Sequence, residues 1–84
     1  GQVDRLAIAD REIHVIDYKT NRAPPRTAAD TPALYVKQMA AYRALLREIY
    51  PGRAVRCFLL WTDGPHLAEL DAARLDSYAA EIQR

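Results

Sequence analysis

The sequence predicts a mixed α/β domain with one β-sheet of about four strands and helices packed against it. Two short apolar runs near the N-terminus are joined by a brief polar segment, which is typical of a β-hairpin. A segment in the middle of the chain and another at its end carry apolar residues at helical spacing. Between them lies the most apolar run, which has the composition of a buried strand. The order strand, strand, helix, strand, strand, helix favours an α/β fold.

The composition limits the classes of function. The 84 residues suffice for one domain, and 50% hydrophobic with 27% charged residues is ordinary globular composition. The formal net charge of +1 gives no general attraction for polyanions, so contact with nucleic acid would depend on local clusters of Lys and Arg. Cys57 is the single cysteine, which excludes an internal disulfide, and its apolar neighbours favour an inert buried thiol. No apolar run approaches the ~20 residues of a membrane span, and a cytoplasmic location is expected.

The N-terminal hairpin is expected from residues 2–9 and 12–20, which are joined through Asp10 and Arg11. Asp-Arg is not a preferred pair for a two-residue turn, so a four-residue loop over 9–12 is equally open. Both loops give the same register, in which the numbers of paired residues sum to 21. A three-residue loop would break it.

This register places two acidic side chains opposite each other. Asp4 pairs with Asp17, with Cβ atoms ~5 Å apart, and like charges at that distance destabilise a sheet unless a cation lies between them. Because alternate residues of a strand point the same way, Lys19 shares their face. Taken alone, an Asp-x-Lys sequence at a strand end is more often a solvated ion pair than a functional site.

A loop over residues 21–30 and a long helix are expected next. Thr31 is the expected N-cap, Pro32 takes the first helical position, and the helix ends near Tyr50 before Pro51-Gly52. Its predicted buried stripe consists of Tyr35, Met39, Tyr42, Leu46 and Ile49.

Gln38 falls within that stripe. A glutamine on a buried face needs hydrogen-bond partners, so Gln38 is either a satisfied core amide or part of a site.

The sequence of the second half of the chain predicts two strands and a helix. A buried strand is expected over 53–61, a turn over 62–65 and a shorter edge strand over 66–70. Asp71 can cap a last helix over 72–83. Its apolar stripe consists of Leu75, Tyr78, Ala79 and Ile82.

The set of Asp4, Asp17 and Lys19 suits metal-dependent chemistry on phosphates. Paired carboxylates on a rigid sheet are hard oxygen ligands for Mg²⁺ or Mn²⁺, and the backbone carbonyl of Tyr18 could add a further oxygen. A cation there would remove the repulsion between the carboxylates, lower the pKa of a bound water and stabilise charge on a phosphoryl oxygen. Lys19 could orient the attacking water or stabilise the negative charge of the transition state.

The two histidines suggest no competing site. His14 lies on the hairpin face opposite Asp17, and His66 follows a turn. Neither has a Cys or His nearby at ligand spacing, so exposed or structural roles are favoured for both.

Three motifs in order resemble the PD-(D/E)XK nuclease superfamily, in its RecB-like branch. The motifs are Gly1-x-x-Asp4-Arg5, Ile16-Asp17-Tyr18-Lys19-Thr20 and Gln38-x-x-x-Tyr42. The resemblance covers essentially the whole chain.

The resemblance implies roles for these residues. Asp4 and Asp17 match the metal carboxylates, Lys19 the catalytic lysine, and Gln38 and Tyr42 a helical motif close to the DNA and the active site. It implies Mg²⁺ or Mn²⁺ as cofactor and DNA as substrate. A basic lining would consist of Lys19, Arg22, Arg26, Lys37 and Arg43, although a solvated surface explains the last four equally well.

The segments Asp17 to Arg22 and Leu59 to Pro65 look most like the nuclease domain of AddA-type subunits of bacterial helicase–nucleases. That likeness implies an exonuclease of double-strand-break repair and recombination, with a second subunit as partner. The family core begins with a helix upstream of the Gly-x-x-Asp strand, whereas this chain opens directly on that strand. Residues 1–84 are therefore expected to be a single nuclease core within a longer subunit, with little cleavage alone and an uncovered sheet face for self-association.

Two other interpretations remain open. The chain could be an inactive module with the nuclease fold that binds DNA or protein. It could also be an unrelated α/β domain in which Asp17 and Lys19 form a surface pair. This last interpretation predicts that the carboxylates of Asp4 and Asp17 lie more than ~10 Å apart, too far to share one cation.

Overall fold

A computed structural model describes residues 4–20 and 23–82 of the chain, and it confirms the α/β class and the expected order of elements. A short 3₁₀ turn, η1 (Ala28–Asp30), interrupts the loop that the sequence predicted to be irregular. No helix in this described part is long and apolar enough to cross a bilayer. The strands and helices are β1 (Arg5–Ile8), β2 (Glu12–Lys19), α1 (Ala33–Ile49), β3 (Ala54–Trp61), β4 (His66–Glu69) and α2 (Ala72–Ile82).

The strands form one mixed sheet in the order β1-β2-β3-β4. β2 and β3 are parallel because α1 carries the chain back between them, and the two outer pairs are antiparallel. In the hairpin, Arg5 pairs with Ile16 and Ile8 with Ile13, so the predicted register is confirmed. A hydrogen bond of 2.9 Å from the Ala9 N–H to the carbonyl of Glu12 closes the turn.

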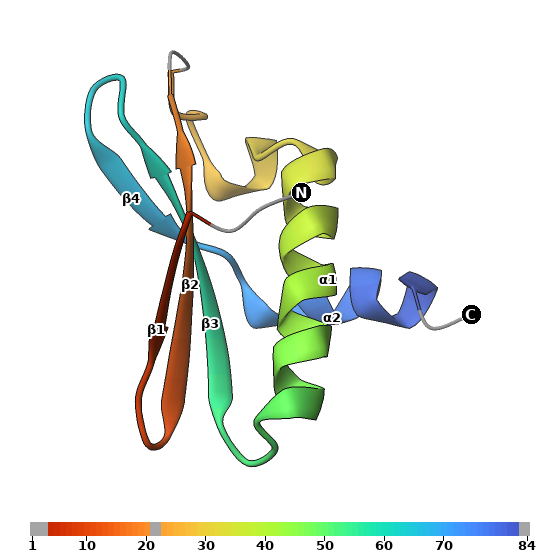
Figure 1. Cartoon of the computed structure of the whole chain (residues 1–84). Coiled ribbons are helices and arrows are strands. Elements are labelled where there is room, and N and C mark those ends of the chain that lie inside the picture. The colour runs from red at the N-terminus through yellow and green to blue at the C-terminus, as the bar shows by residue number, and fades with distance from the viewer. Residues whose placement is uncertain (1–3, 21–22, 83–84) are drawn as a thin grey trace.

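Both helices lie on the same side of the sheet (Figure 1). α1 packs on β3, and α2 packs on α1. The buried side chains between these layers are Ile13, Val15, Val36, Met39, Ala40, Leu46, Val55, Cys57, Leu59, Trp61, Leu70 and Leu75.

Cys57 lies in this core, as its apolar neighbours predicted. The thiol is fully buried beside the backbone carbonyl of Met39, at 3.9 Å. Burial raises the pKa of Cys57 to about 11, so the thiol stays protonated and unreactive near neutral pH.

The predicted stripe of α1 is wrong in part. Met39 and Leu46 are buried as expected, but Val36 and Ala40 complete the buried face, whereas Ile49 is 56% exposed. The reason is tertiary: α2 packs against α1 and turns the buried arc of the helix toward itself. Helical periodicity finds an apolar stripe, but it does not show which neighbouring element widens it.

The expected capping of α1 is also wrong. Pro32 occupies the N-cap position, and the structure shows no side-chain capping bond. Thr31 is buried instead, and its carbonyl accepts a hydrogen bond of 3.0 Å from the guanidinium of Arg74 on α2. The same guanidinium donates to the carbonyl of Ala28 at 3.2 Å, so the loop before α1 is fixed to α2.

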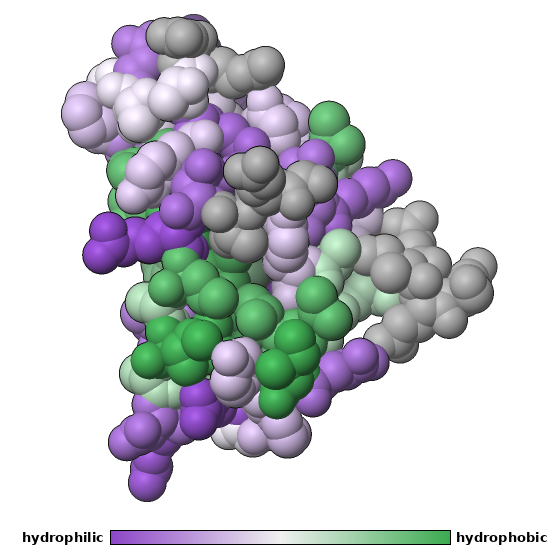
Figure 2. All heavy atoms as spheres, viewed as in Figure 1, coloured by the Kyte–Doolittle hydropathy of each residue, from purple (hydrophilic) through white to green (hydrophobic). Residues whose placement is uncertain are grey.

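Two apolar surfaces stay exposed in the described chain. On the helix side, Leu6 and Ile8 of β1 and Leu45 of α1 are 44%, 46% and 52% exposed. Figure 2 shows apolar side chains gathered over β1 and the lower half of α1. The opposite sheet face has no helix over it among the described residues, in agreement with the expected uncovered face. Its apolar residues are Ile16, Tyr18, Phe58, Leu60 and Leu67.

Adjacent leucines of β3 test which sheet face carries the core. Leu59 is fully buried under the helices, so Leu59→Ala should lower the free energy of unfolding by about 2–5 kcal/mol. Leu60 points to the uncovered face and is only partly buried, so Leu60→Ala should cost below about 2 kcal/mol. Urea unfolding of the two variants measures the difference, and equal losses would contradict the layer arrangement.

Candidate active site

Asp17 and Lys19 lie near the carboxyl end of β2, on the face that the helices cover. They follow Ile13 and Val15 on the same side of the strand, so alternation carries both charged side chains to the edge of the core. The ammonium nitrogen of Lys19 lies 2.5 Å from Oδ2 of Asp17, and the two side chains are only 13% and 16% exposed. The ion pair is therefore largely withdrawn from water.

Asp4 reaches this pair from the residue before β1. Its Oδ2 accepts a hydrogen bond of 2.7 Å from the backbone N–H of Tyr18. A second hydrogen bond joins the carboxyl groups of Asp4 and Asp17 themselves. The two carboxylates are therefore in direct contact, as the register predicted, and the interpretation that required them to be far apart is wrong.

The two carboxyl groups have unlike proton affinities. Burial and, next, the hydrogen bond with Asp4 raise the pKa of Asp17, although Lys19 opposes the rise. The hydrogen bond from Asp17 and the Tyr18 N–H lower the pKa of Asp4, which is exposed. Asp17 therefore holds a proton more readily than Asp4 does.

The donor set fits a hard divalent cation. A cation between Asp4 and Asp17 would relieve the repulsion between their negative charges. Among the described residues no cluster of three or more His, Cys, Asp or Glu side chains could hold a metal. Two carboxylates with water ligands are nevertheless the usual protein contribution to a Mg²⁺ site. The structure shows the N–H of Tyr18 holding Asp4, and its carbonyl as a ligand stays a prediction.

Tyr35 is a site residue that the sequence did not reveal. The Lys19 ammonium lies 3.9 Å from the centre of the Tyr35 ring, in the first turn of α1. The ring packs at 6.0 Å from that of Trp61, which pairs with Lys19 across β2 and β3. The helical stripe assigned Tyr35 to the core. One feature of the sequence could have indicated Tyr35 as a site residue. Lys19 and Trp61 each end a strand of the parallel pair, and the helix that connects these strands starts beside them.

Comparison with protein-family models decides the family. The model of the PD-(D/E)XK nuclease superfamily matches residues 1–84. The chain belongs to the PD-(D/E)XK nuclease superfamily. No curated protein and no solved structure matches the chain. Membership identifies a nuclease fold, nuclease chemistry and the general use of divalent metal ions in this superfamily.

Gln38 and Tyr42, which the resemblance assigned to a helical motif, both lie on α1. Gln38 is exposed, which corrects its predicted place on the buried face. With Ala41, Tyr42 and Leu45 it lines a hollow of about 300 Å³. The Tyr42 hydroxyl is buried and has no hydrogen-bond partner within the described part of the chain. Tyr42 therefore packs against the core, while exposed Gln38 borders the hollow at the surface.

Two of the proposed basic residues, Lys37 and Arg43, contact α2 rather than the carboxylates. Lys37 lies 5.7 Å from the centre of the Tyr78 ring on α2. Arg43 pairs with Asp76 of α2 at 2.5 Å. Arg26 belongs to the loop before α1, and Arg22 lies outside the described residues. Of the described members, Lys19 is the one in contact with the carboxylates.

The histidines stay outside the site, as predicted. His14 faces the opposite side of the sheet, where it bonds Glu12 at 2.8 Å and contacts the ring of Phe58 edge-on. His66 is exposed at the start of β4.

Titration with Mn²⁺ tests the donor set directly. Because the paramagnetic ion broadens nearby NMR signals, we expect selective broadening of the Tyr18 and Lys19 amides. Asp17→Ala should abolish this broadening, since it removes one of the two carboxylates. Asp10→Ala, at the far end of the same hairpin, should leave it unchanged. Equal broadening in all three proteins, or broadening centred on Glu12 and Glu69, would contradict the site.

Proposed function

We propose that the chain is the catalytic core of a Mg²⁺- or Mn²⁺-dependent exonuclease that hydrolyses phosphodiester bonds of DNA. The observation that carries the proposal is the direct contact of Asp4 with Asp17, beside Lys19, on one face of the sheet. Two carboxylates with a largely buried lysine provide the ligands and the positive charge that this reaction needs.

Each residue of the site has a separate task. When bound, the metal supplies a water of lowered pKa and stabilises charge on the phosphoryl oxygens. Asp4 and Asp17 hold it, and the Tyr18 N–H fixes the orientation of Asp4. The Lys19 ammonium is fixed and weakly hydrated, so it can orient the attacking water or stabilise the negative charge that develops on the phosphate.

We infer that the core works within a helicase–nuclease. The likeness of Asp17 to Arg22 and of Leu59 to Pro65 to AddA-type RecB-like domains supports a place in a longer subunit. Such a subunit would act in the cytoplasm on strands unwound during double-strand-break repair and recombination, together with a second subunit. Arg22 and Lys37 would contact the backbone of the DNA, and Gln38 and Tyr42 would border its path.

An inactive module that binds DNA or protein is the second candidate. The observation that favours it is the apolar surface of Leu6, Ile8 and Leu45, together with the uncovered sheet face. Surfaces of this kind mark protein contacts, including self-association of the isolated core. This candidate predicts binding without cleavage.

Cleavage of DNA by the full-length protein separates the two candidates. With Mg²⁺ or Mn²⁺ present, Asp17→Ala and Lys19→Ala should each lower kcat at least about 10²-fold, because each removes a group that stabilises the transition state. Asp10→Ala serves as the control and should cut at the wild-type rate.

Two outcomes would contradict the proposal. Cleavage by both Asp17→Ala and Lys19→Ala at the wild-type rate would refute the catalytic assignment. Binding of DNA by the wild type without cleavage in either metal would favour the inactive module.

A further inference from the structure

We propose that Tyr35 is the positioning residue of Lys19. Its ring holds the ammonium in place when Asp17 engages a metal ion. This inference rests on the proposed function, and it names a device that the three sequence motifs do not contain.

Among the described residues, Lys19 contacts two groups of unlike chemistry. One is the Asp17 carboxylate at 2.5 Å, and the other is the face of the Tyr35 ring at 3.9 Å. A cation over an aromatic face is attracted by the negative charge density of the ring, and more strongly where water is excluded. The Lys19 side chain is 13% exposed, so the contact with Tyr35 is little screened by solvent.

Of these two contacts, the one between Lys19 and Asp17 is the one that metal binding would disturb. Asp17 is held by Lys19 and by Asp4, and it is also a proposed metal ligand. Once its oxygens share their charge with a divalent cation, the carboxylate attracts Lys19 less and the cation repels the ammonium. A lysine with four rotatable bonds would then regain much of its rotamer freedom. The Tyr35 ring carries no formal charge, and its face still attracts the ammonium.

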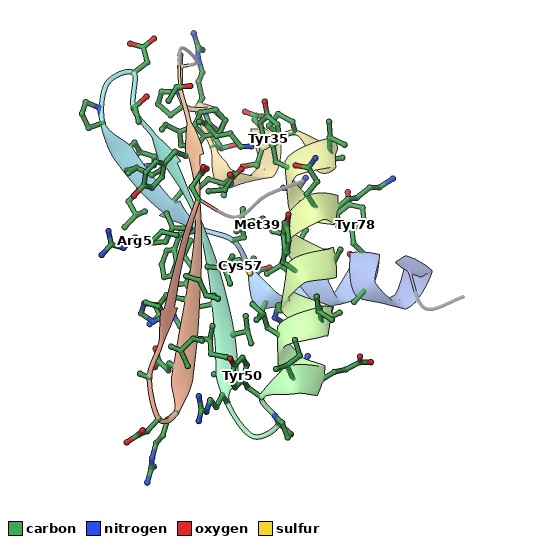
Figure 3. All side chains as sticks on the ribbon, in the orientation of Figure 1. Arg5, Tyr35, Met39, Tyr50, Cys57 and Tyr78 are labelled. Atoms are coloured by element: carbon green, nitrogen blue, oxygen red, sulfur yellow. The ribbon has the colours of Figure 1, made fainter. Side chains whose placement is uncertain are left out.

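Contacts within the start of α1 and with β3 position the Tyr35 ring. The backbone N–H of Tyr35 donates to the carbonyl of Pro32 at 3.0 Å, which fixes the first turn of α1. The ring packs against Trp61, which is 3% exposed and pairs with Lys19 in the parallel ladder. Figure 3 shows Tyr35 near the start of α1, and Tyr50 at the other end of the helix. One end of α1 is thereby tied to both strands that border the site.

The aromatic face is the property that this role requires. Tyr35→Phe keeps the face and should keep the position of Lys19. Tyr35→Leu keeps an apolar side chain but loses the ring, and Tyr35→Met does the same with more flexibility if the leucine variant fails to fold. Tyr50→Leu is the matched control, because Tyr50 lies at the far end of α1 with the Arg53 guanidinium 5.1 Å from its ring.

The first measurement needs no activity. In the metal-free protein, the ring should shift the NMR signals of the Lys19 Cε protons upfield. We expect this upfield shift in the wild type, in Tyr35→Phe and in Tyr50→Leu, and its loss in Tyr35→Leu. With a diamagnetic metal, Mg²⁺, the shift should persist in the wild type.

The second measurement separates positioning from folding. In Tyr35→Leu we expect kcat to fall roughly 2- to 30-fold, which corresponds to the ~0.5–2 kcal/mol of a cation–π contact. KM for DNA and the affinity for Mn²⁺ should stay at wild-type values, because the proposed role of the ring is to position Lys19 and not to bind DNA or metal. Tyr35→Phe should keep kcat at the wild-type value. Thermal unfolding checks that each variant is folded.

Three results would overturn the inference. They are the absence of an upfield shift in the wild type, its loss when Mg²⁺ binds, and an equal fall of kcat in Tyr35→Phe and Tyr35→Leu. A full-length wild-type protein that cuts no DNA would refute the proposed function, while the NMR signals would still decide whether the ring holds Lys19.

Discussion

The contact between the carboxyl groups of Asp4 and Asp17 is the constraint on which the site depends. Pairing of Arg5 with Ile16 through Ile8 with Ile13 brings the two side chains to one face, and the N–H of Tyr18 fixes Asp4 there. Two like charges in contact destabilise a hairpin unless a proton or a cation is shared. The sheet therefore maintains an arrangement that costs stability, which is common where a protein keeps groups ready for a ligand.

The parallel pairing of β2 and β3 makes this arrangement possible. α1 must cross over the sheet between the two strands, so its first turn returns near the ends where both strands stop. Lys19 and Trp61 are paired at those ends, and Tyr35 packs on both. Lys19, already paired with Asp17 on β2, thus acquires the Tyr35 ring of α1 as a second neighbour through topology, and Trp61 of β3 packs against that ring.

The sequence predicted the parts of the structure that depend on local rules. The register followed because loops of two or four residues give the same pairing, and strand alternation then placed Asp4, Asp17 and Lys19 together. Predictions that depend on the contact between elements did less well. Gln38 and Ile49 are exposed because α2 shifts the buried arc of α1, and Thr31 lost its capping role because its segment bonds Arg74. The ring of Tyr35 over Lys19 depends on how the helix docks, which no spacing encodes.

The two halves of the carboxylate pair differ in how firmly the fold holds them. Asp17 projects from a strand with neighbours on both sides, whereas Asp4 precedes β1, whose residues are all exposed and which lies at the sheet edge. Edge elements with few buried contacts open at lower free energy than the core, so opening of β1 would separate Asp4 from Asp17 while the helices and β3 stay folded. A cation that needs both carboxylates binds the closed hairpin selectively and stabilises it by mass action. Metal binding and the packing of β1 are therefore thermodynamically linked. A partner that covers the exposed Leu6 and Ile8 would stabilise the same closed hairpin.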